Sequence, residues 1–600
     1  MTSPKQGAGM VLGAVPHDGA EAVIASYVQA GIRAFLFPGI FLMEPERLSA
    51  LAAEARRLVA LAGTGPALVA LGGWDEASAS FPMVPDLPSP LCLAANQERR
   101  LARHAGFLLG HAASGAGVDL VMGPRLDLAT DPKARGGIMD LFGEDPQAAA
   151  RLGAAFARGL ARGGVAACGL SFPGCGSLSM DSRREPSTLP FEAERLAEAE
   201  ERPFARAIKA GLPAILVARA YVPAYDEEHI PAARSSLAIE GRLRSALGFR
   251  GLVLGGALDE DPERPGRAAL LGALAGCDFS LALDPEVALE AAAGLEAAVK
   301  EGEIPSPRPA IQSRRLEALL SALAAPPLRT RTLPIYASPL VAGFGARTAE
   351  LGATLLRGPR GPRGPAPSSR REALHDVRHG QAPGGTAGET HAARREARYS
   401  IPNLSRRSQA PRARPAAGIV PLREGLSVLL FMPPSASGNS RRSTALLSAL
   451  REELPGARIF SLPADPSEGD AMAVLSEIIE PSAGPAAAGG VSDGSAGAGA
   501  GAAGGGTGTG RTAGNALVLS CDAHLRPSQE SFIHVLEESL ESVSIIALRD
   551  PYDAAFFPRA AAIGAVYGDS EASIRAAARL ALGRIEARGR CPVRVLGMEV

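Results

Sequence analysis

Eight short apolar runs alternate with longer stretches of helical periodicity between residue 8 and roughly residue 300. Each run is about as long as a strand that is buried on both faces of a parallel sheet. The alternation predicts an α/β chain whose N-terminal part, residues 1–304, is a (β/α)8 barrel of the TIM type. An open, doubly wound sheet is the competing architecture. The runs are Met10–Val15, Ile32–Phe37, Ala67–Leu71, Val118–Met122, Val165–Cys168, Ala214–Ala218, Gly251–Leu254 and Phe279–Leu283.

The stretch DPQAAARLGAAFARGLARGG, residues 145–164, indicates how the intervening helices begin and end. Its apolar residues recur with a period of about 3.6 residues. Asp145 precedes a proline, and its carboxylate can accept hydrogen bonds from the first free N–H groups of a helix. Gly163 and Gly164 can end that helix, because glycine readily adopts the left-handed conformation of a C-terminal cap.

A strongly basic segment follows the predicted barrel. Residues 305–356 are interpreted as a connector with helical segments, and the composition then changes. Residues 357–415 hold 13 Arg against 4 Asp and Glu, with few large apolar side chains. Such a segment cannot bury enough surface to offset the entropy of ordering, so residues 357–418 are predicted to be a disordered linker. A solvated linker is favoured over a tether to RNA or to an anionic surface.

A second α/β domain, an α/β sandwich, is predicted over residues 419–600. Low-complexity sequence rich in Gly and Ala interrupts it at residues 482–513, which are predicted to be a disordered insert. Helical stretches separate the expected strands of this domain. These strands are expected at residues 426–432, 457–462, 516–521 and 544–550.

Composition excludes several classes of protein. The net charge is −1, so nucleic acid is not expected as a partner apart from the basic linker. The six cysteines are scattered without a CxxC pair, which indicates reduced thiols in a cytoplasmic protein and argues against disulfides or a zinc site. No apolar run reaches about 18 residues, so no membrane span is expected. No cofactor or metal is predicted, and the oligomeric state is left open.

Several motifs occur in an order typical of one enzyme family. Through them the chain resembles family 3 glycoside hydrolases, in the bacterial β-N-acetylhexosaminidase branch, whose members have a barrel followed by an α/β sandwich. The resemblance implies the same fold and, as the activity of the family, hydrolysis of glycosides with retention of configuration. The motifs are GPRLDLATDP (123–132), LFGEDPQ (141–147), ERPFARAIKAGLPAILVARAYVPAYDEEHIPA (201–232), LRSALGFRGLVLGGALDE (243–260) and ALRDPYDAAFFP (547–558).

The catalytic groups that the resemblance implies are replaced in this chain. The family nucleophile is the Asp of a T-D-x-L segment, and Gly256 stands at that position. The resemblance assigns the acid/base histidine and its aspartate to a loop K-H-F-P-G-H-G-D-T, which reads LSFPGCGSL here, with Cys175 and Ser177 at the two positions. Farther along, Asp181 matches a D-S-H segment whose histidine is replaced by Arg183.

The positions that bind the sugar in the family differ in the same way. Gly72 stands where an aspartate would bind sugar hydroxyls, Asp140 replaces an arginine and Arg219 replaces a histidine. Trp74, the only tryptophan, follows the third predicted strand. Its ring could stack on a sugar or pack in a core or an interface, and both interpretations are open.

A few residues could replace the missing groups. Asp259 and Glu260 lie just past the nucleophile position, Cys175 could donate a proton, and Asp127 with Asp181 could form a carboxylate pair at the barrel mouth. A structural role is favoured for each of them. A reacting group that is displaced by even about 1 Å loses much of its effect, and an ordinary thiol has a pKa near 8.5.

Three functions remain as hypotheses. The favoured one is a catalytically degenerate family member that acts as a carbohydrate-binding or interaction module. The alternative is an active O-glycosyl hydrolase on GlcNAc-containing or peptidoglycan-derived sugars that uses relocated residues. The third is a site for an anionic ligand, because Arg125, Arg183, Arg184 and Arg219 fall on predicted loops at the carboxyl ends of strands. The candidate ligand-binding residues are Asp127, Asp181, Arg183, Arg219 and Trp74.

Overall fold

The computed structural model describes residues 5–72, 87–131, 138–178, 187–259, 263–324, 339–358, 426–433, 440–479 and 512–595. The chain divides into two units: the first comprises Met1–Gly358 and Gly418–Val600, and the second comprises Pro359–Ala417. The second unit is outside the described residues, as are most of the predicted basic linker and of the predicted Gly- and Ala-rich insert.

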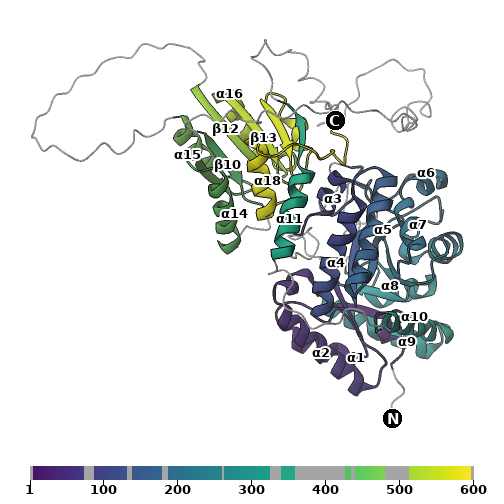
Figure 1. The fold of residues 1–600 in the computed structure, drawn as a ribbon. Coiled ribbons are helices and arrows are strands. Elements are labelled where there is room, and N and C mark those ends of the chain that lie inside the picture. The colour runs from purple at the N-terminus through teal and green to yellow at the C-terminus, as the bar shows by residue number, and fades with distance from the viewer. Residues whose placement is uncertain are drawn as a thin grey trace, which may run out of the picture. The chain divides into compact units, whose positions relative to one another are not determined.

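The N-terminal part of the first unit is a closed barrel of eight parallel strands in chain order (Figure 1). Strand β1 pairs with β2 on one side and with β8 on the other, and these pairings close the barrel. The predicted barrel is therefore confirmed, and the competing open sheet is wrong. The strands are Val11–Ala14 (β1), Ala34–Pro38 (β2), Leu68–Gly72 (β3), Leu120–Arg125 (β4), Ala166–Phe172 (β5), Ala214–Val217 (β6), Leu252–Gly255 (β7) and Phe279–Ala282 (β8).

Helical segments link successive strands of the barrel. Helix α5 shows the caps that the sequence indicates: the Asp145 carboxylate accepts hydrogen bonds from the N–H groups of Gln147 and Ala148, and left-handed Gly164 ends the helix. The segments are η1 (Ala8–Met10), α1 (Ala20–Ala30), η2 (Gly39–Met43), α2 (Pro45–Ala62), α3 (Pro90–Asn96), α4 (Arg99–Gly115), α5 (Pro146–Gly163), α6 (Ala193–Glu198), α7 (Arg202–Lys209), η3 (Ala232–Arg234), η4 (Leu237–Ala246), α8 (Pro265–Ala275), α9 (Pro285–Glu301) and α10 (Pro307–Ala324).

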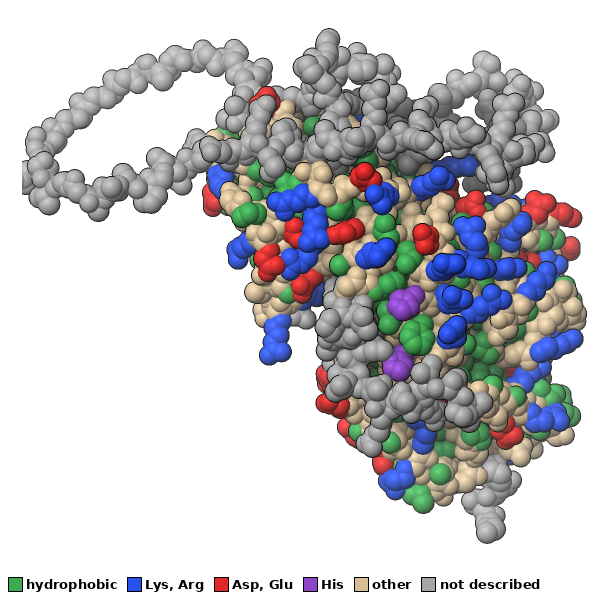
Figure 2. All heavy atoms as spheres, viewed as in Figure 1, with side chains coloured by type: hydrophobic (Ala, Val, Ile, Leu, Met, Phe, Trp, Pro, Cys, Tyr) green, Lys and Arg blue, Asp and Glu red, His purple; other side chains and the backbone are tan. Residues whose placement is uncertain are grey.

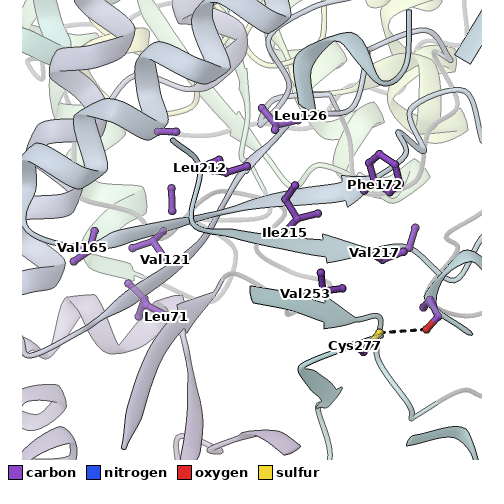
Figure 3. Close-up of a cluster of buried hydrophobic side chains, with 14 of the residues drawn as sticks. Leu71, Val121, Leu126, Val165, Phe172, Leu212, Ile215, Val217, Val253 and Cys277 are labelled. Carbon is purple, nitrogen blue, oxygen red and sulfur yellow. Dashed lines mark hydrogen bonds between the residues drawn. The ribbon is translucent and has the colours of Figure 1, made fainter. Parts of the chain in front are cut away.

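The barrel has two apolar layers, because side chains alternate between the two faces of each strand. One set, which includes Leu12, Leu36 and Phe279, fills the inside of the barrel. The alternate set, which includes Val121 and Val253, packs against the surrounding helices (Figure 3). This filled interior leaves the loops at the carboxyl ends of the strands as the place for a site.

A buried aspartate holds the amino ends of the last two strands. Asp278 lies directly before β8, and its carboxylate is fully buried. The carboxylate accepts hydrogen bonds from the N–H group of Val253 and from the guanidinium groups of Arg244, Arg308 and Arg315. The surrounding donors compensate for the removal of this charge from water.

Helices α4 and α5 approach closely because glycines face one another across their interface. A Cβ on Gly110 would lie 2.6 Å from the carbonyl oxygen of Leu160, and one on Gly159 would collide with the carbonyl oxygen of Arg103. The interface therefore excludes side chains at these positions, although glycine weakens an isolated helix.

The rest of the first unit contains a six-stranded sheet with the order β11-β10-β12-β13-β14-β9. All of its pairs are parallel except β14 with β9. The strands are Thr354–Arg357 (β9), Ser427–Phe431 (β10), Arg458–Leu462 (β11), Thr512–Ser520 (β12), Leu540–Ala547 (β13) and Ala562–Ala565 (β14). The helices are α11 (Pro339–Gly352), α14 (Ser440–Glu453), α15 (Glu468–Ile479), η7 (Ala523–Leu525), α16 (Pro527–Ser539), α17 (Asp553–Phe556) and α18 (Glu571–Ala581).

Strands β9 and β14 were not expected from the sequence. Residues 305–356 were interpreted as a connector, but Thr354–Arg357 at its end is the antiparallel edge strand of the second sheet. A four-residue run next to a Gly- and Pro-rich segment is too short to be recognised by its periodicity. The second domain therefore takes one strand from the chain that precedes the basic segment.

A polar network is buried at the carboxyl ends of β12 and β13. The Ser520 hydroxyl donates a hydrogen bond to one oxygen of Asp553, and the other oxygen lies 2.8 Å from Nδ1 of His524. Burial alone would lower the pKa of His524, but the hydrogen bond to Asp553 and the charge of Asp550 raise it to about 9. Burial raises the pKa of Asp550 to about 7.

Charges of both signs cover the surface. On the face shown in Figure 2, Lys and Arg side chains are interspersed with Asp and Glu side chains over the described residues. This mixture agrees with the net charge of −1. Within the described ranges, no helix has both the length and the apolar character needed to cross a membrane.

We expect the substitution Gly159→Ala to lower the free energy of unfolding by about 1–3 kcal/mol, because the backbones of α4 and α5 would have to move apart. Gly115→Ala is the matched control on α4, since a Cβ there would meet nothing within 4 Å. The control should be neutral or slightly stabilising. Chemical denaturation measures both, and equal effects would show that close packing does not determine the use of glycine here.

The His524 network should make the stability of the second domain depend on pH. The pKa of His524 is raised to about 9 in the folded state, so its contribution is complete below about pH 6.5 and is lost as the pH rises through 9. We therefore expect His524→Gln to destabilise the protein by on the order of 2 kcal/mol at pH 6 and by much less at pH 9.5.

Thermal unfolding at the two pH values measures this difference. His534→Gln is the control, because the His534 side chain on α16 is 41% exposed. If His524→Gln destabilises the protein equally at both pH values, the His524 imidazole is not the group whose protonation stabilises the fold.

Candidate functional site

The candidate site lies at the carboxyl ends of the barrel strands. Gly256 directly follows β7, and Arg219 follows β6, the neighbouring strand. Arg219 is only 4% exposed. A Cβ on Gly256 would lie 3.0 Å from Cγ and 3.5 Å from Cδ of Arg219. The arginine side chain therefore occupies the space beside the position where the resemblance expects the nucleophile.

The β5 loop keeps its backbone shape through close contacts with glycines. A Cβ on Gly176 would collide with the carbonyl oxygen of Leu128, so the β4 and β5 loops touch through their backbones. Cys175 is half-buried, and its N–H group donates a hydrogen bond of 2.9 Å to Asp127. The Ser177 hydroxyl is buried and has no hydrogen-bond partner among the residues that the structure describes. The loop is thus held in place, although the residue types that the family uses there are absent.

Asp127 joins the two loops. It is 1% exposed, and its carboxylate accepts hydrogen bonds from the N–H groups of Ser171 and Cys175. Arg125 donates to Asp127 at 3.2 Å and to Asp140 at 2.9 Å. Burial by itself lowers the pKa of Arg125, but these two carboxylates raise it above its usual value. Asp127 therefore acts as a brace in this structure.

Glu200 is a buried carboxyl group that the sequence analysis missed. It is 2% exposed, and Gly174 of the β5 loop packs against it, since a Cβ there would lie 3.0 Å from Cβ of Glu200. One oxygen accepts a long hydrogen bond of 3.4 Å from Arg195, and the other has no hydrogen-bond partner within the described part of the chain. Burial raises the pKa of Glu200 to about 7; the charge of Arg195 opposes this shift, and the charge of Asp127 adds to it. Only tertiary packing creates this environment, so no sequence pattern indicates it.

The carboxylate of Asp259, which could have substituted for the nucleophile, binds backbone N–H groups after β8. Its carboxylate accepts hydrogen bonds of 2.6–3.0 Å from the N–H groups of Leu283 and Asp284, which follow β8. These bonds direct the carboxylate toward backbone donors. The structural interpretation of Asp259 is thereby favoured over a catalytic one.

The β6–β7 side of the mouth carries two neighbouring guanidinium groups. Burial, and next the positive charge of Arg219, lowers the pKa of Arg234, while Glu263 opposes this shift. The ring of Tyr221 on the same loop stacks on His229, with 3.7 Å between ring centroids. Positive charge and an aromatic surface therefore occur together on this loop.

Several predicted site residues lie outside the described residues. They are Trp74, Asp181, Arg183, Arg184 and Glu260. The structure brings Arg125 together with Asp127 and Cys175, and it brings Arg219 next to Gly256. In the part of the chain that the structure describes, no group of three or more His, Cys, Asp or Glu residues could hold a metal ion.

Comparison with known proteins gives a consistent family. Residues 22–319 match the model of the glycosyl hydrolase family 3 N-terminal domain. A β-hexosaminidase of Thiobacillus denitrificans is 36% identical over 269 residues, which cover 42% of this chain and 70% of that protein. A β-hexosaminidase of Chromobacterium violaceum is 35% identical over 167 residues, 27% of this chain and 45% of that protein. This chain thus spans less than half of the length of the second relative.

A solved structure extends the fold comparison to the whole chain. It is a glycoside hydrolase family 3 β-N-acetylglucosaminidase from Paenibacillus sp. str. FPU-7, with a TM-score of 0.75 and 21% sequence identity. The match covers 99% of each chain. At this identity the solved structure supports only the fold. The similarity to the β-hexosaminidase sequences shows the family. The chain therefore belongs to glycosyl hydrolase family 3, in its β-hexosaminidase branch.

Proposed function

We propose that this protein is a glycoside hydrolase that acts on β-N-acetylhexosaminides. Its catalytic carboxyl groups would be residues other than the one at position 256. The observation that carries the proposal is the 36% identity along 70% of a β-hexosaminidase. The intact barrel and the braced β4 and β5 loops support it, because they form the scaffold on which such a site is built. The predicted cytoplasmic location stays a prediction.

Glu200 is the best candidate for the proton donor. Cleavage of a glycosidic bond needs an acid that is protonated near the working pH and that then loses its proton to the leaving oxygen. A pKa of about 7 leaves Glu200 roughly half protonated at neutral pH. Asp127, whose charge acts on Glu200 and which also braces the β5 loop, is the candidate for the second carboxylate.

A second function is favoured by one specific observation, the packing of the Arg219 side chain beside the nucleophile position. In a retaining glycosidase a carboxylate at this position forms the covalent intermediate and lies close to a cationic transition state. Gly256 has no side chain that could form the intermediate, and the neighbouring Arg219 has the opposite charge to a carboxylate. The second candidate is therefore a carbohydrate-binding module without turnover, which retains the family scaffold.

We expect the purified full chain to hydrolyse an aryl β-N-acetylglucosaminide and Glu200→Gln to lower kcat by at least about 100-fold. Activity should fall as the pH rises through about 7, because the protonated form of Glu200 is lost. Glu198→Gln is the control, since Glu198 is exposed on the same segment. If the chain binds the glycoside and does not hydrolyse it at high protein concentration, the second function replaces the first.

We expect Gly256→Asp alone to add little activity, because the new carboxylate would lie beside Arg219 and pair with it. The double variant Gly256→Asp and Arg219→His removes this pairing. It should exceed the single variant in kcat/KM by on the order of tenfold or more. The same aryl glycoside assay, with circular dichroism to check folding, measures both. A single variant that is as active as the double variant would show that Arg219 does not suppress the chemistry.

A further inference from the structure

We propose that the outer surface of helices α4, α5 and α7 of the barrel binds single-stranded RNA. We call this surface the basic face. It lies on the outside of the helices and contains no residue of the candidate site, so the inference does not rest on the proposed function. The cations of the basic face are Arg99, Arg100 and Arg103 on α4, Arg151, Arg158 and Arg162 on α5, and Arg202, Arg206 and Lys209 on α7.

The three helices contain no acidic residue. Their sequences are RRLARHAGFLLGHAASG, PQAAARLGAAFARGLARG and RPFARAIK, and each holds three Lys or Arg and no Asp or Glu. The net charge of −1 is an average over the whole chain and does not describe such a local surface. The excess of positive charge follows from the residue types alone.

The cations of the basic face are exposed and lack partners. Each of these side chains is exposed, and none has an ion pair or a side-chain hydrogen bond in the part of the chain that the structure describes. Other exposed arginines do have carboxylate partners: Arg57 pairs with Glu54 at 2.6 Å, and Arg588 pairs with Glu586 at 2.8 Å. The basic face is therefore free to bind an anion from outside the chain.

Acidic residues at the starts of the helices do not neutralise the basic face. The Asp145 carboxylate caps α5 and accepts hydrogen bonds from two backbone N–H groups. Glu201 precedes α7, but it is buried and pairs with Arg242. Glu98, before α4, is exposed and forms no ion pair within the described ranges.

The spacing of the cations places one stripe on each helix. Residues four or seven apart lie on the same side of a helix, as Arg158 does with Arg151 and with Arg162. Helix α5 packs against α4 and against α7. The contact with α4 is close, because a Cβ on Gly159 would collide with the carbonyl oxygen of Arg103. Lys and Arg side chains gather where α5 and α7 lie in the shared view (Figure 1, Figure 2).

This arrangement is unfavourable without a partner. Like charges four residues apart destabilise a helix, and here three such helices lie side by side. A chain of negative charges along the stripes would offset this repulsion and release the counterions of both surfaces.

The curvature of the barrel favours a flexible partner. Successive helices around an eight-stranded barrel point outward in directions that differ by about 45°. The stripes of α4 and α7 therefore point roughly 90° apart, with α5 between them. A flat bilayer or a straight duplex contacts only part of such a surface, whereas a single strand can bend over all three helices.

Aromatic rings lie among the arginines of α4. The ring centroids of His104 and Phe107 are 6.1 Å apart, and those of Phe107 and His111 are 5.8 Å apart. His104 is exposed, and burial of part of its ring lowers its pKa, so the ring is uncharged at neutral pH. Rings within a basic surface stack on the bases of a single strand. An acidic peptide has no group that uses them in this way.

The sequence contains a second source of positive charge for the same class of partner. Residues 357–415, which begin RGPRGPRGP, hold 13 Arg against 4 Asp and Glu. Arginine- and glycine-rich segments bind single-stranded nucleic acid without sequence preference. Nucleic acid that is unpaired in cells is mainly RNA, which selects RNA as the partner.

Fluorescence anisotropy of the full chain with a labelled oligouridylate of about 20 nucleotides tests the inference. We expect binding at roughly 50 mM salt that becomes weaker by on the order of tenfold or more at roughly 200 mM salt, because phosphate contacts release counterions. No binding at the lower salt concentration would overturn the inference.

Two triple variants locate the binding. Arg103→Gln, Arg158→Gln and Arg162→Gln together should weaken RNA binding by on the order of tenfold and reduce the slope of log K against log salt by about 2. The matched control replaces three exposed arginines with glutamine elsewhere and removes the same charge; its positions are Arg57, Arg267 and Arg588. Thermal unfolding checks that both variants are folded.

A single variant tests the stacking. His104→Gln should weaken the binding of RNA by about threefold or more and leave the binding of polyglutamate of equal charge unchanged, because only the bases stack on the ring. Equal effects on both polymers would overturn the choice of RNA.

The other outcomes separate the basic face from its alternatives. Unchanged RNA affinity in the first triple variant assigns binding to residues outside the face and overturns the inference. Equal losses in both triple variants show an effect of net charge only, and they also overturn it. Polyglutamate that binds wild-type protein as tightly as RNA indicates a surface for acidic proteins. Vesicles of phosphatidylserine that compete equally well with RNA indicate a membrane surface. Hydrolysis of the aryl glycoside is measured separately, so failure of the proposed function leaves these results unaffected.

Discussion

The barrel depends on the buried carboxylate of Asp278. This group accepts hydrogen bonds from the backbone of β7 and from three arginines, so it connects the last strands to η4 and α10. Asp119, before β4, accepts from the N–H group of Val69 and from Arg56 in the same way. Such buried carboxylates tolerate little change, since loss of one partner leaves a charge without compensation. Buried ion pairs therefore hold the amino end of the barrel in place.

Much of the fold could be predicted because its signals are local. Apolar runs bounded by turns indicated the eight barrel strands, and Asp145 and Gly164 marked the ends of α5. Strand β9 escaped prediction because a strand of four residues is defined by its partner β14 and not by its own pattern. Glu200 escaped for a related reason: its pKa follows from burial against the β5 loop, which no spacing in the sequence encodes.

The two sides of the barrel mouth have become electrically different. On the β4–β5 side, Asp127 and Asp140 share Arg125, and burial raises the pKa of Glu200 to about 7. On the β6–β7 side, the Arg219 side chain packs beside Gly256, where the resemblance expects a carboxylate. The first side carries buried carboxyl groups, and the second has a glycine directly after β7. Family membership alone therefore does not determine the chemistry of the site in this chain.

The pairing of β9 with β14 has a consequence for how the protein is made. Arg357 of β9 donates a hydrogen bond to the carbonyl oxygen of Phe557, 200 residues later in the chain. At a translation rate of about 5–20 residues per second, the edge strand leaves the ribosome roughly 10–40 s before its partner. During that interval the barrel can already fold, while β9 waits as an unpaired strand at its end. The second sheet is therefore completed only after β14 has been made, by a strand that was among the first of its parts to be made.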